Sequence, residues 1–266
     1  MAVWSYLDLA GSPRAAAEFF AFAQGHRIDT LYLGAAGLLP GQGEPLAAFL
    51  QEAQHRGLRV SLVLGRDAWT RPEHHGEALA EVRAIGTFAR SMRAAGRVAP
   101  VSLQLDVEPH ALPDWGRNQV RLAGDYLDLV AAARAELQGG LPLDLAIPVW
   151  WDQVVLRRQG RKGSLSEWAM GQADVTVLMD YRNQAEGILA GAADGLRLAE
   201  GLHRQVVVGL AVHRNREAET ARTSFGRKGQ GALYRAMDEV DRRLKGRPGY
   251  GGFAVFTYED WCRVGW

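Results

Sequence analysis

The stretch Val101-Ser-Leu-Gln-Leu-Asp-Val-Glu-Pro-His110 indicates both the fold of this chain and the place of its functional site. Apolar and polar residues alternate along it, so an extended backbone would have one apolar face and one polar face. Successive side chains of a β-strand point to opposite faces, which places Asp106 and Glu108 side by side near the carboxyl end of a strand. Pro109 has no N–H to donate and should end that strand. Two carboxylates held where a strand meets a loop indicate acid–base chemistry.

Seven further segments have the pattern of short strands. Some are nearly continuous apolar runs, as expected of strands that are covered on both faces. The eight predicted strands are Val3–Leu9, Asp29–Gly34, Arg59–Gly65, Val101–Glu108, Leu143–Val149, Val175–Tyr181, Val206–Val212 and Gly252–Tyr258.

The segments between the predicted strands have helical patterns. Ser12 followed by Pro13 is typical of a helix start, and Asp114 could cap a long helix that Gly139 and Gly140 end. The predicted helices are Arg14–Gln24, Pro45–Arg56, Pro72–Ala95, Asp114 to about Gln138, Ser164–Met170, Ala185–Leu202 and Gly229–Lys245.

Alternation of eight strands with helices predicts an α/β fold, a single (β/α)8 TIM barrel over residues 1–266. A doubly wound open sheet is the alternative. Such a sheet usually carries a glycine-rich phosphate loop after its first strand. The corresponding segment here, Leu9-Ala-Gly-Ser-Pro13, has one glycine and does not match that pattern.

Composition excludes other classes of function. The 31 basic and 30 acidic residues give a net charge of +1, which argues against a nucleic acid or membrane partner bound through bulk charge. The single Cys262 excludes an internal disulfide and a cysteine-based metal site. No apolar run is long enough for a transmembrane helix. We expect a monomer without a cofactor.

The amino terminus gives no sign of an export signal. Met1–Tyr6 enters a strand-like pattern at once, without a basic region before an apolar core. We expect a protein that is either cytoplasmic or secreted with its signal removed.

The predicted strand ends are rich in carboxylates and aromatic side chains. In barrels of this kind, functional residues gather at the carboxyl ends of the strands. Aromatic rings pack on the apolar faces of sugar rings and carboxylates bind hydroxyl groups, so this mixture indicates a carbohydrate site.

Three short motifs resemble those of the family-18 glycoside hydrolases, which are chitinase-type (β/α)8 enzymes. They are Leu105-Asp-Val-Glu108 on the predicted fourth strand, Met179-Asp-Tyr181 on the sixth, and Thr257-Tyr-Glu-Asp-Trp261 at the end of the eighth. The order of the motifs and their strand numbers agree with the family over most of the chain.

Two features depart from the family pattern. The longer motif Asp-x-x-Asp-x-Asp-x-Glu would place aspartates where this chain has Val101 and Gln104. The residue after the tyrosine of the Met-x-Tyr motif, usually an aspartate, is Arg182.

The resemblance implies hydrolysis of glycosidic bonds in an oligo- or polysaccharide that contains amino sugars. Glu108 would be the general acid, Asp106 would orient the 2-acetamido group of the substrate, and Tyr181 would hydrogen-bond that group in a retaining, substrate-assisted reaction. The expected substrate-binding residues are Asp180, Arg182, Trp150, Trp261, Glu259, Tyr258, Trp4, Tyr6, Arg66 and His213.

Other interpretations stay open. The two acids could be a structural pair bridged to Arg66 or Arg182, or the chain could be a carbohydrate-binding barrel without catalysis. A metal-dependent hydrolase or isomerase is a further alternative, although no His-x-His strand signature is present. Its candidate ligands are Asp106, Glu108, His110, His213 and Glu259.

A basic segment follows the predicted fifth strand. It contains Arg157-Arg158 and Arg161-Lys162. We expect either an exposed loop or a lid that grips an anionic sugar or polymer.

Overall fold

The computed structural model describes residues 1–39, 41–137, 140–214 and 220–264. Eight strands form a closed barrel in the order β1-β10-β9-β8-β5-β4-β3-β2, and helices alternate with them along the chain. The predicted (β/α)8 barrel is confirmed. The chain divides into two compact units, Tyr6–Asp144 and Met1–Ser5 with Leu145–Trp266.

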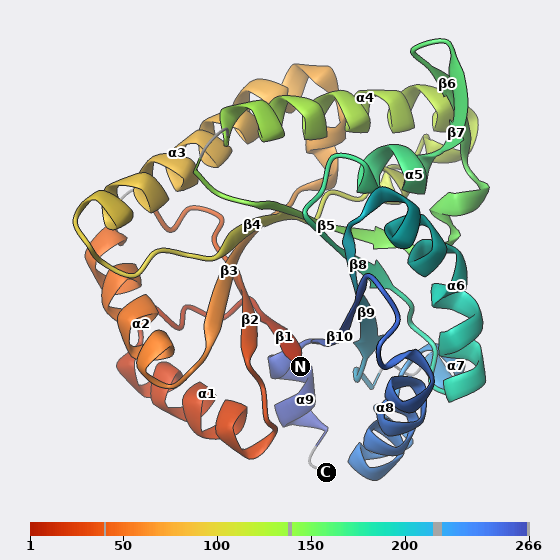
Figure 1. Cartoon of the computed structure of the whole chain (residues 1–266). Helices are drawn as coiled ribbons and strands as arrows, with labels where there is room; N and C mark the ends of the chain where they lie inside the picture. The colour runs from red at the N-terminus through yellow and green to blue at the C-terminus, as the bar shows by residue number, and fades with distance from the viewer. Residues whose placement is uncertain (40, 138–139, 215–219, 265–266) are drawn as a thin grey trace. The chain divides into compact units, whose positions relative to one another are not determined.

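The unit Tyr6–Asp144 carries three parallel barrel strands in the order β2-β3-β4, with helices between them along the chain (Figure 1). Tyr32 of β2 lies opposite Ser61 of β3, and Leu62 of β3 lies opposite Leu103 of β4. Its elements are α1 (Pro13–Gly25), β2 (Thr30–Gly34), α2 (Gly43–His55), β3 (Arg59–Leu64), the 3-10 turns η1 (Asp67–Thr70) and η2 (Pro72–His74), α3 (His75–Ala94), β4 (Ser102–Leu105), η3 (Pro109–Ala111) and α4 (Trp115–Glu136).

The second unit carries parallel strands in the order β8-β9-β10-β1. Strand β5 (Leu143–Pro148) spans the boundary between the two units. Beyond these strands the second unit has an antiparallel hairpin, β6–β7. Its elements are β1 (Ala2–Ser5), η4 (Val149–Gln153), β6 (Val155–Arg158), β7 (Arg161–Ser164), α5 (Leu165–Met170), β8 (Val175–Met179), α6 (Ala185–Leu202), β9 (Gln205–Ala211), α7 (Thr220–Thr223), α8 (Gln230–Leu244), β10 (Tyr250–Phe256) and α9 (Tyr258–Arg263).

All eight predicted strands are present, but several end earlier than predicted. The first was expected to reach Leu9, whereas β1 ends at Ser5, and the sixth was expected to reach Tyr181, whereas β8 ends at Met179. We expected a strand up to Tyr258, whereas β10 ends at Phe256 and α9 begins at Tyr258. The reason is a helix cap, because the Thr257 hydroxyl accepts a hydrogen bond from the Asp260 N–H at 3.2 Å. The hairpin β6–β7 and the short helices α7 and α9 were not predicted.

Helix starts follow the local sequence at α1 but not at α4. Ser12 accepts a hydrogen bond from the Ala15 N–H at 3.3 Å, as its place before Pro13 predicts. Asp114 precedes α4 without forming a side-chain cap, because its carboxylate binds arginine side chains instead. The predicted end of that helix at Gly139 lies outside the described residues. Among the helices described, none is long and apolar enough to span a bilayer.

The cap of α1 can be tested directly. Ser12→Ala removes the accepting oxygen and should lower the free energy of unfolding by about 1 kcal/mol. Ser12→Asp keeps an acceptor at the same position and should change it by less than about 0.5 kcal/mol. Urea denaturation followed by circular dichroism measures both variants. Equal losses in the two variants would show that the capping bond contributes nothing.

Candidate active site

Asp106 and Glu108 follow the last residue of β4 in a backbone that still pairs with β3. The Asp106 N–H donates to the Leu64 carbonyl at 2.9 Å, so the ladder runs one residue beyond the strand. Val107 between the two acids is fully buried. Pro109 then opens the turn η3, as its missing N–H predicts. The alternation expected from the sequence therefore continues through both acids.

Asp106 is held by a hydroxyl group from the first strand-to-helix loop. The Tyr6 hydroxyl donates to Asp106 Oδ2 at 3.2 Å. Burial raises the pKa of Asp106 to about 6, and the nearby Asp67 raises it further, whereas the Tyr6 hydrogen bond lowers it. The phenol of Tyr126 on α4 also faces this charge, and burial and Asp106 raise its pKa. Asp106 thus loses its proton at a higher pH than an ordinary aspartate.

Two glycines at strand ends make room for this arrangement. A Cβ on Gly65 would lie 2.0 Å from the Asp106 carbonyl oxygen, and one on Gly34 would lie 2.8 Å from Tyr6 Cδ1. Any side chain at Gly65 would push the Asp106 backbone away from β3. The sequence shows both glycines, but their role depends on contacts that only the fold supplies.

Glu108 is partly buried, with 33% of its side chain exposed. Burial raises its pKa to about 7, with further contributions from the negative charges of Asp106 and Asp67. His110 Nε2 lies 3.4 Å from Glu108 Oε2, and burial lowers the pKa of this histidine. A glutamic acid of this kind can keep its proton near neutral pH and donate it. Asp67 was not among the predicted site residues, and His110 was named only as a candidate ligand of the metal alternative.

Arg66 does not occupy the place expected for it as a partner of these acids. Its guanidinium binds Glu77 and lies 3.6 Å from Glu81, both on α3. It also lies over the ring of Trp69, 5.5 Å from its centroid. Because its ion pairs are with α3, the hypothesis that Arg66 neutralises Asp106 and Glu108 finds no support here.

A cavity of about 360 Å³ adjoins Asp106. Its wall combines the carboxylate with the exposed Tyr6 and Leu7 and with small residues that follow β2. The lining residues are Tyr6, Leu7, Asp8, Gly34, Ala35, Ala36, Gly37, Leu38, Gln42, Val63, Gly65 and Asp106. Such a mixed polar and apolar hollow is suited to part of a small organic ligand.

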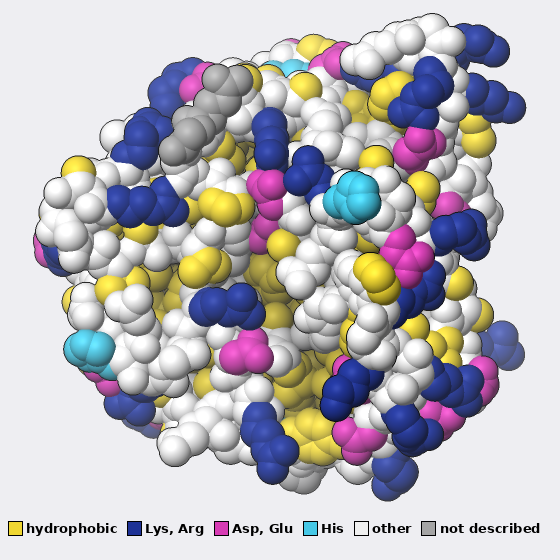
Figure 2. All heavy atoms as spheres, viewed as in Figure 1, with side chains coloured by type: hydrophobic (Ala, Val, Ile, Leu, Met, Phe, Trp, Pro, Cys, Tyr) yellow, Lys and Arg dark blue, Asp and Glu magenta, His cyan; other side chains and the backbone are white. Residues whose placement is uncertain are grey.

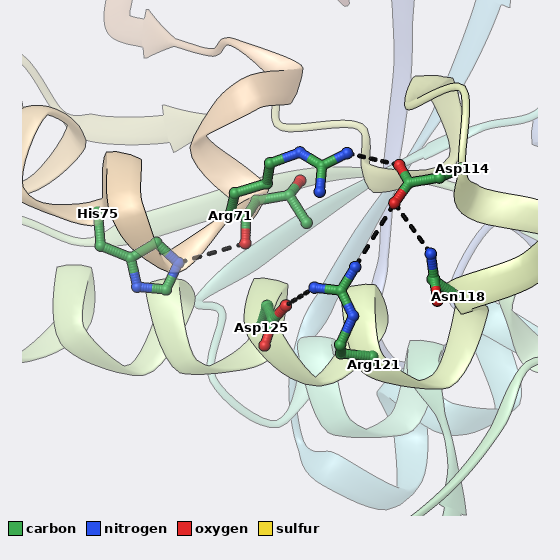
Figure 3. A network of polar contacts seen from close by, with 7 residues as sticks. Arg71, His75, Asp114, Asn118, Arg121 and Asp125 are labelled. Carbon is green, nitrogen blue, oxygen red and sulfur yellow. Dashed lines mark hydrogen bonds and ion pairs between the residues drawn. The ribbon is translucent and has the colours of Figure 1, made fainter.

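Ion pairs fix the loops that carry Asp67 and His110. Figure 3 shows Asp114 between Arg71 and Arg121, at 2.5 and 3.5 Å, with Asn118 donating at 3.0 Å. Arg71 follows η1, and Asp114 precedes α4. The pair therefore links the segment after β3 to the segment after β4, and it explains why Asp114 does not cap its helix.

In the second unit, Asp180 is a fully buried carboxylate that binds Arg182. Burial raises the pKa of Asp180 to about 6, although Arg182 opposes the shift. A Cβ on Gly191 of α6 would lie 1.9 Å from Arg182 Nη1, so this ion pair depends on a glycine. The aspartate and arginine of this motif are thus bound to each other.

Tyr181 belongs to an aromatic cluster in the same unit. Its ring lies 6.0 Å from that of Phe256, which in turn meets Trp4 edge-on at 5.8 Å. These rings come from the segments at the ends of β8, β10 and β1. Phe256 was not among the predicted residues because the strand was expected to continue to Tyr258. The proposed hydrogen bond from Tyr181 to substrate stays a prediction.

The predicted sugar-stacking aromatics differ in exposure. Trp150 is 37% exposed, whereas Tyr258, Trp261 and Trp4 are 6%, 3% and 1% exposed. Trp4 is enclosed, and Trp261 on α9 is buried with its ring 6.4 Å from that of Tyr234. Substrate contacts by Trp4 and Trp261 stay predictions. Trp150 remains the candidate stacking surface.

Two further predicted residues have polar neighbours in this unit. Glu259 accepts a hydrogen bond from the Ser5 hydroxyl at 3.0 Å. The carbonyl of His213 accepts one from the Ser224 hydroxyl at 2.7 Å. Substrate contacts by these two side chains stay predictions. Within the described ranges, no group of three or more His, Cys, Asp or Glu side chains could hold a metal ion, so the metal alternative has no ligand set there.

The raised pKa of Asp106 predicts a stability that depends on pH. Because the folded pKa of about 6 exceeds the ordinary 3.8, folding takes up a proton between these values, and stability falls as the pH rises through them. Asp106→Asn removes this loss and keeps an acceptor for Tyr6. We expect the free energy of unfolding to rise by about 1–3 kcal/mol near pH 8, and by less than half of that near pH 4.

Guanidinium denaturation at the two pH values measures this effect. Asp125→Asn, which changes an exposed ion pair on α4, is the control and should change stability by less than about 1 kcal/mol. A loss of stability in Asp106→Asn near neutral pH would contradict the assignment of a raised pKa.

Comparisons with known proteins agree with the fold. No protein-family model and no curated protein sequence matches this chain. The structure is similar to a GH18 chitinase from Pseudoalteromonas aurantia, with 12% identity, 100% of this chain and 96% of that chain covered, and a TM-score of 0.60. An endo-beta-1,4-mannanase from Thermotoga petrophila matches with 12% identity, 96% and 67% coverage and a TM-score of 0.62. A chitinase from Bacteroides thetaiotaomicron matches with 10% identity, 97% and 90% coverage and a TM-score of 0.56. At these identities the similarity shows a fold shared with glycoside hydrolases.

Proposed function

We propose that this protein is a glycoside hydrolase of the family-18 type that cleaves glycosidic bonds in an amino-sugar-containing oligo- or polysaccharide. The observation that carries the proposal is the pair of acids after β4. Glu108 has a pKa near 7 and a partly exposed side chain, and Asp106 beside it lines a cavity. The motif resemblance and the shared fold support the same chemistry.

Glu108 acts as the proton donor in the first step. It gives its proton to the glycosidic oxygen as the bond to the anomeric carbon breaks and the acetamido carbonyl oxygen of the substrate forms a new bond to that carbon. In the second step the ionised Glu108 takes a proton from water, which attacks the same carbon and releases the acetamido group. The configuration at the anomeric carbon is retained.

Asp106 and Tyr181 assist the acetamido group. Ionised Asp106 accepts a hydrogen bond from the N–H of the acetamido group and stabilises the positive charge that develops on that group. The Tyr181 hydroxyl donates a hydrogen bond to the acetamido oxygen. Asp106 is already bound by Tyr6, which fixes its carboxylate for this role. Asp106 is partly buried and held by Tyr6. An aspartate held in this way is suited to orienting the acetamido group, which is the nucleophile in this mechanism.

Removal of the proton donor tests the proposal. Glu108→Gln keeps the shape of the side chain and should leave the thermal unfolding temperature close to that of the wild type. It should lower kcat/KM by roughly a hundred- to ten-thousand-fold. A panel of defined oligosaccharides with and without N-acetylamino sugars, analysed by mass spectrometry, supplies the substrate. Glu77→Gln on α3 is the control. Intact binding of glycans by the wild type without any hydrolysis would favour the non-catalytic alternative.

The pH profile offers a second test. Asp106 should be ionised and Glu108 protonated, so kcat/KM should fall below about pH 6 and above about pH 7. Asp67 raises the pKa of both acids, so Asp67→Asn should lower both and move the whole profile to lower pH. A profile that moves to higher pH or does not change in the Asp67→Asn variant would show that Asp106 and Glu108 do not set the pH dependence of the reaction.

A further inference from the structure

The hairpin β6–β7 carries four cationic side chains, and its register places them opposite one another. Arg157 pairs with Lys162, and Arg158 pairs with Arg161. Side chains directly opposite across an antiparallel pair lie about 5 Å apart, and like charges in such positions destabilise the pair. The stability of the hairpin therefore does not explain these residues.

The two faces of the hairpin differ. On one face Leu156 is buried, and Arg161 binds Glu167 and lies over the ring of Trp168, 4.2 Å from its centroid. The Leu165 N–H donates to the Val154 carbonyl at 2.7 Å and closes the base of the hairpin. These contacts hold the hairpin in place against α5 without help from the other face.

The outer face carries two cations without carboxylate partners. Arg157 and Lys162 are exposed, and across the ranges that the structure describes neither forms an ion pair. Val155 on the same face is 45% exposed. Figure 2 shows Lys and Arg side chains gathered over β6 and β7, at the upper right of the view. We call Val155, Arg157 and Lys162 the outer hairpin face.

The hairpin follows the end of β5 through η4, the turn that carries the exposed Trp150. The carboxyl ends of barrel strands are where ligand-binding loops lie in this fold. η4 also contacts β7. An exposed indole and two cations thus lie on neighbouring segments at this strand end, and together they offer a stacking surface and positive charge.

We propose that the outer hairpin face binds an acidic group of a glycan chain, so that the substrate of this protein carries carboxylates along its length. The proposal rests on the proposed function for the nature of the ligand. Arg157 donates two parallel hydrogen bonds to a carboxylate, and Lys162 adds a point charge. Because Arg157 and Lys162 lie directly opposite each other, about 5 Å apart, they can bind the same carboxylate group. A nucleic acid offers a much denser row of phosphates and is bound through many cations, whereas the net charge of this chain is +1.

The test measures binding in a Glu108→Gln background, so that no substrate is consumed. The probes are hyaluronan oligosaccharides, which carry a carboxylate on every second sugar, and neutral chitin oligosaccharides of equal length. Arg157→Gln with Lys162→Gln should weaken hyaluronan binding by up to about 25-fold, because each exposed ion pair is worth up to about fivefold in affinity. Binding of the neutral probe should be unchanged. The hyaluronan affinity should also fall as salt is raised.

A matched control changes two exposed cations elsewhere in the same unit, Arg235 and Arg242 on α8, to glutamine. This control should leave both affinities unchanged. The thermal unfolding temperature of the hairpin variant should stay equal or rise, because a repulsive pair is removed. A fall in that temperature would show that the cations stabilise the hairpin, and it would overturn the proposal.

Other outcomes also decide the question. Equal losses for both probes, equal losses in the α8 control, or tighter binding of single-stranded DNA than of hyaluronan through Arg157 and Lys162 would each overturn the proposal. Failure of the proposed function has a different signature. The wild type would then cleave neither probe nor any member of the oligosaccharide panel, whatever the hairpin binds.

Discussion

The candidate site depends on the close approach of two backbones at the end of β3 and β4. The Asp106 N–H bonds to Leu64 at 2.9 Å, and the absent side chain of Gly65 leaves room for the Asp106 carbonyl. This pairing keeps the backbone extended past the strand, so the alternation that buries Val107 also brings Asp106 and Glu108 together. Without this pairing, Asp106 and Glu108 would lie on an unpaired loop. Their carboxylates could then move apart into solvent, and their pKa values would return toward ordinary values.

This arrangement opposes stability. An aspartate whose pKa is raised to about 6 lowers the stability of the folded protein at neutral pH. Asp67 raises the pKa values of both Asp106 and Glu108 further. Ion pairs of Asp114 with Arg71 and Arg121 join the two adjacent loops. Carboxyl groups whose pKa values are raised by burial and by neighbouring acids occur often at functional sites.

The local sequence pattern predicted most of the barrel because strand-like segments alternate regularly with helical segments along the chain. The prediction failed where a single residue starts a different element, as a helix cap does. Thr257 caps α9 and removes Tyr258 and Trp261 from the strand end, although the Thr257-x-x-Asp260 spacing is a recognisable cap signature. The hairpin was hidden because its pairs have like charges. The acids were predictable from alternation, whereas the influence of Asp67 and His110 arises from loops that only the folded chain brings near.

The departures from the family motif have a physical consequence for Asp106. The pattern places a second aspartate at position 104, where it could share a proton with the middle acid, but here Gln104 is neutral and buried on β4. A hydroxyl group replaces that partner, since Tyr6 donates to Asp106. Burial rather than a neighbouring carboxylate is then the main reason for the raised pKa of Asp106. At position 182 the family pattern has an aspartate, whereas the arginine of this chain is bound to Asp180, so the segment after β8 carries an ion pair. Each of these departures replaces a carboxylate of the family pattern by a neutral or cationic side chain. Motifs with fewer carboxylates repel an acidic ligand less, which is consistent with the acidic glycan proposed for the hairpin β6–β7.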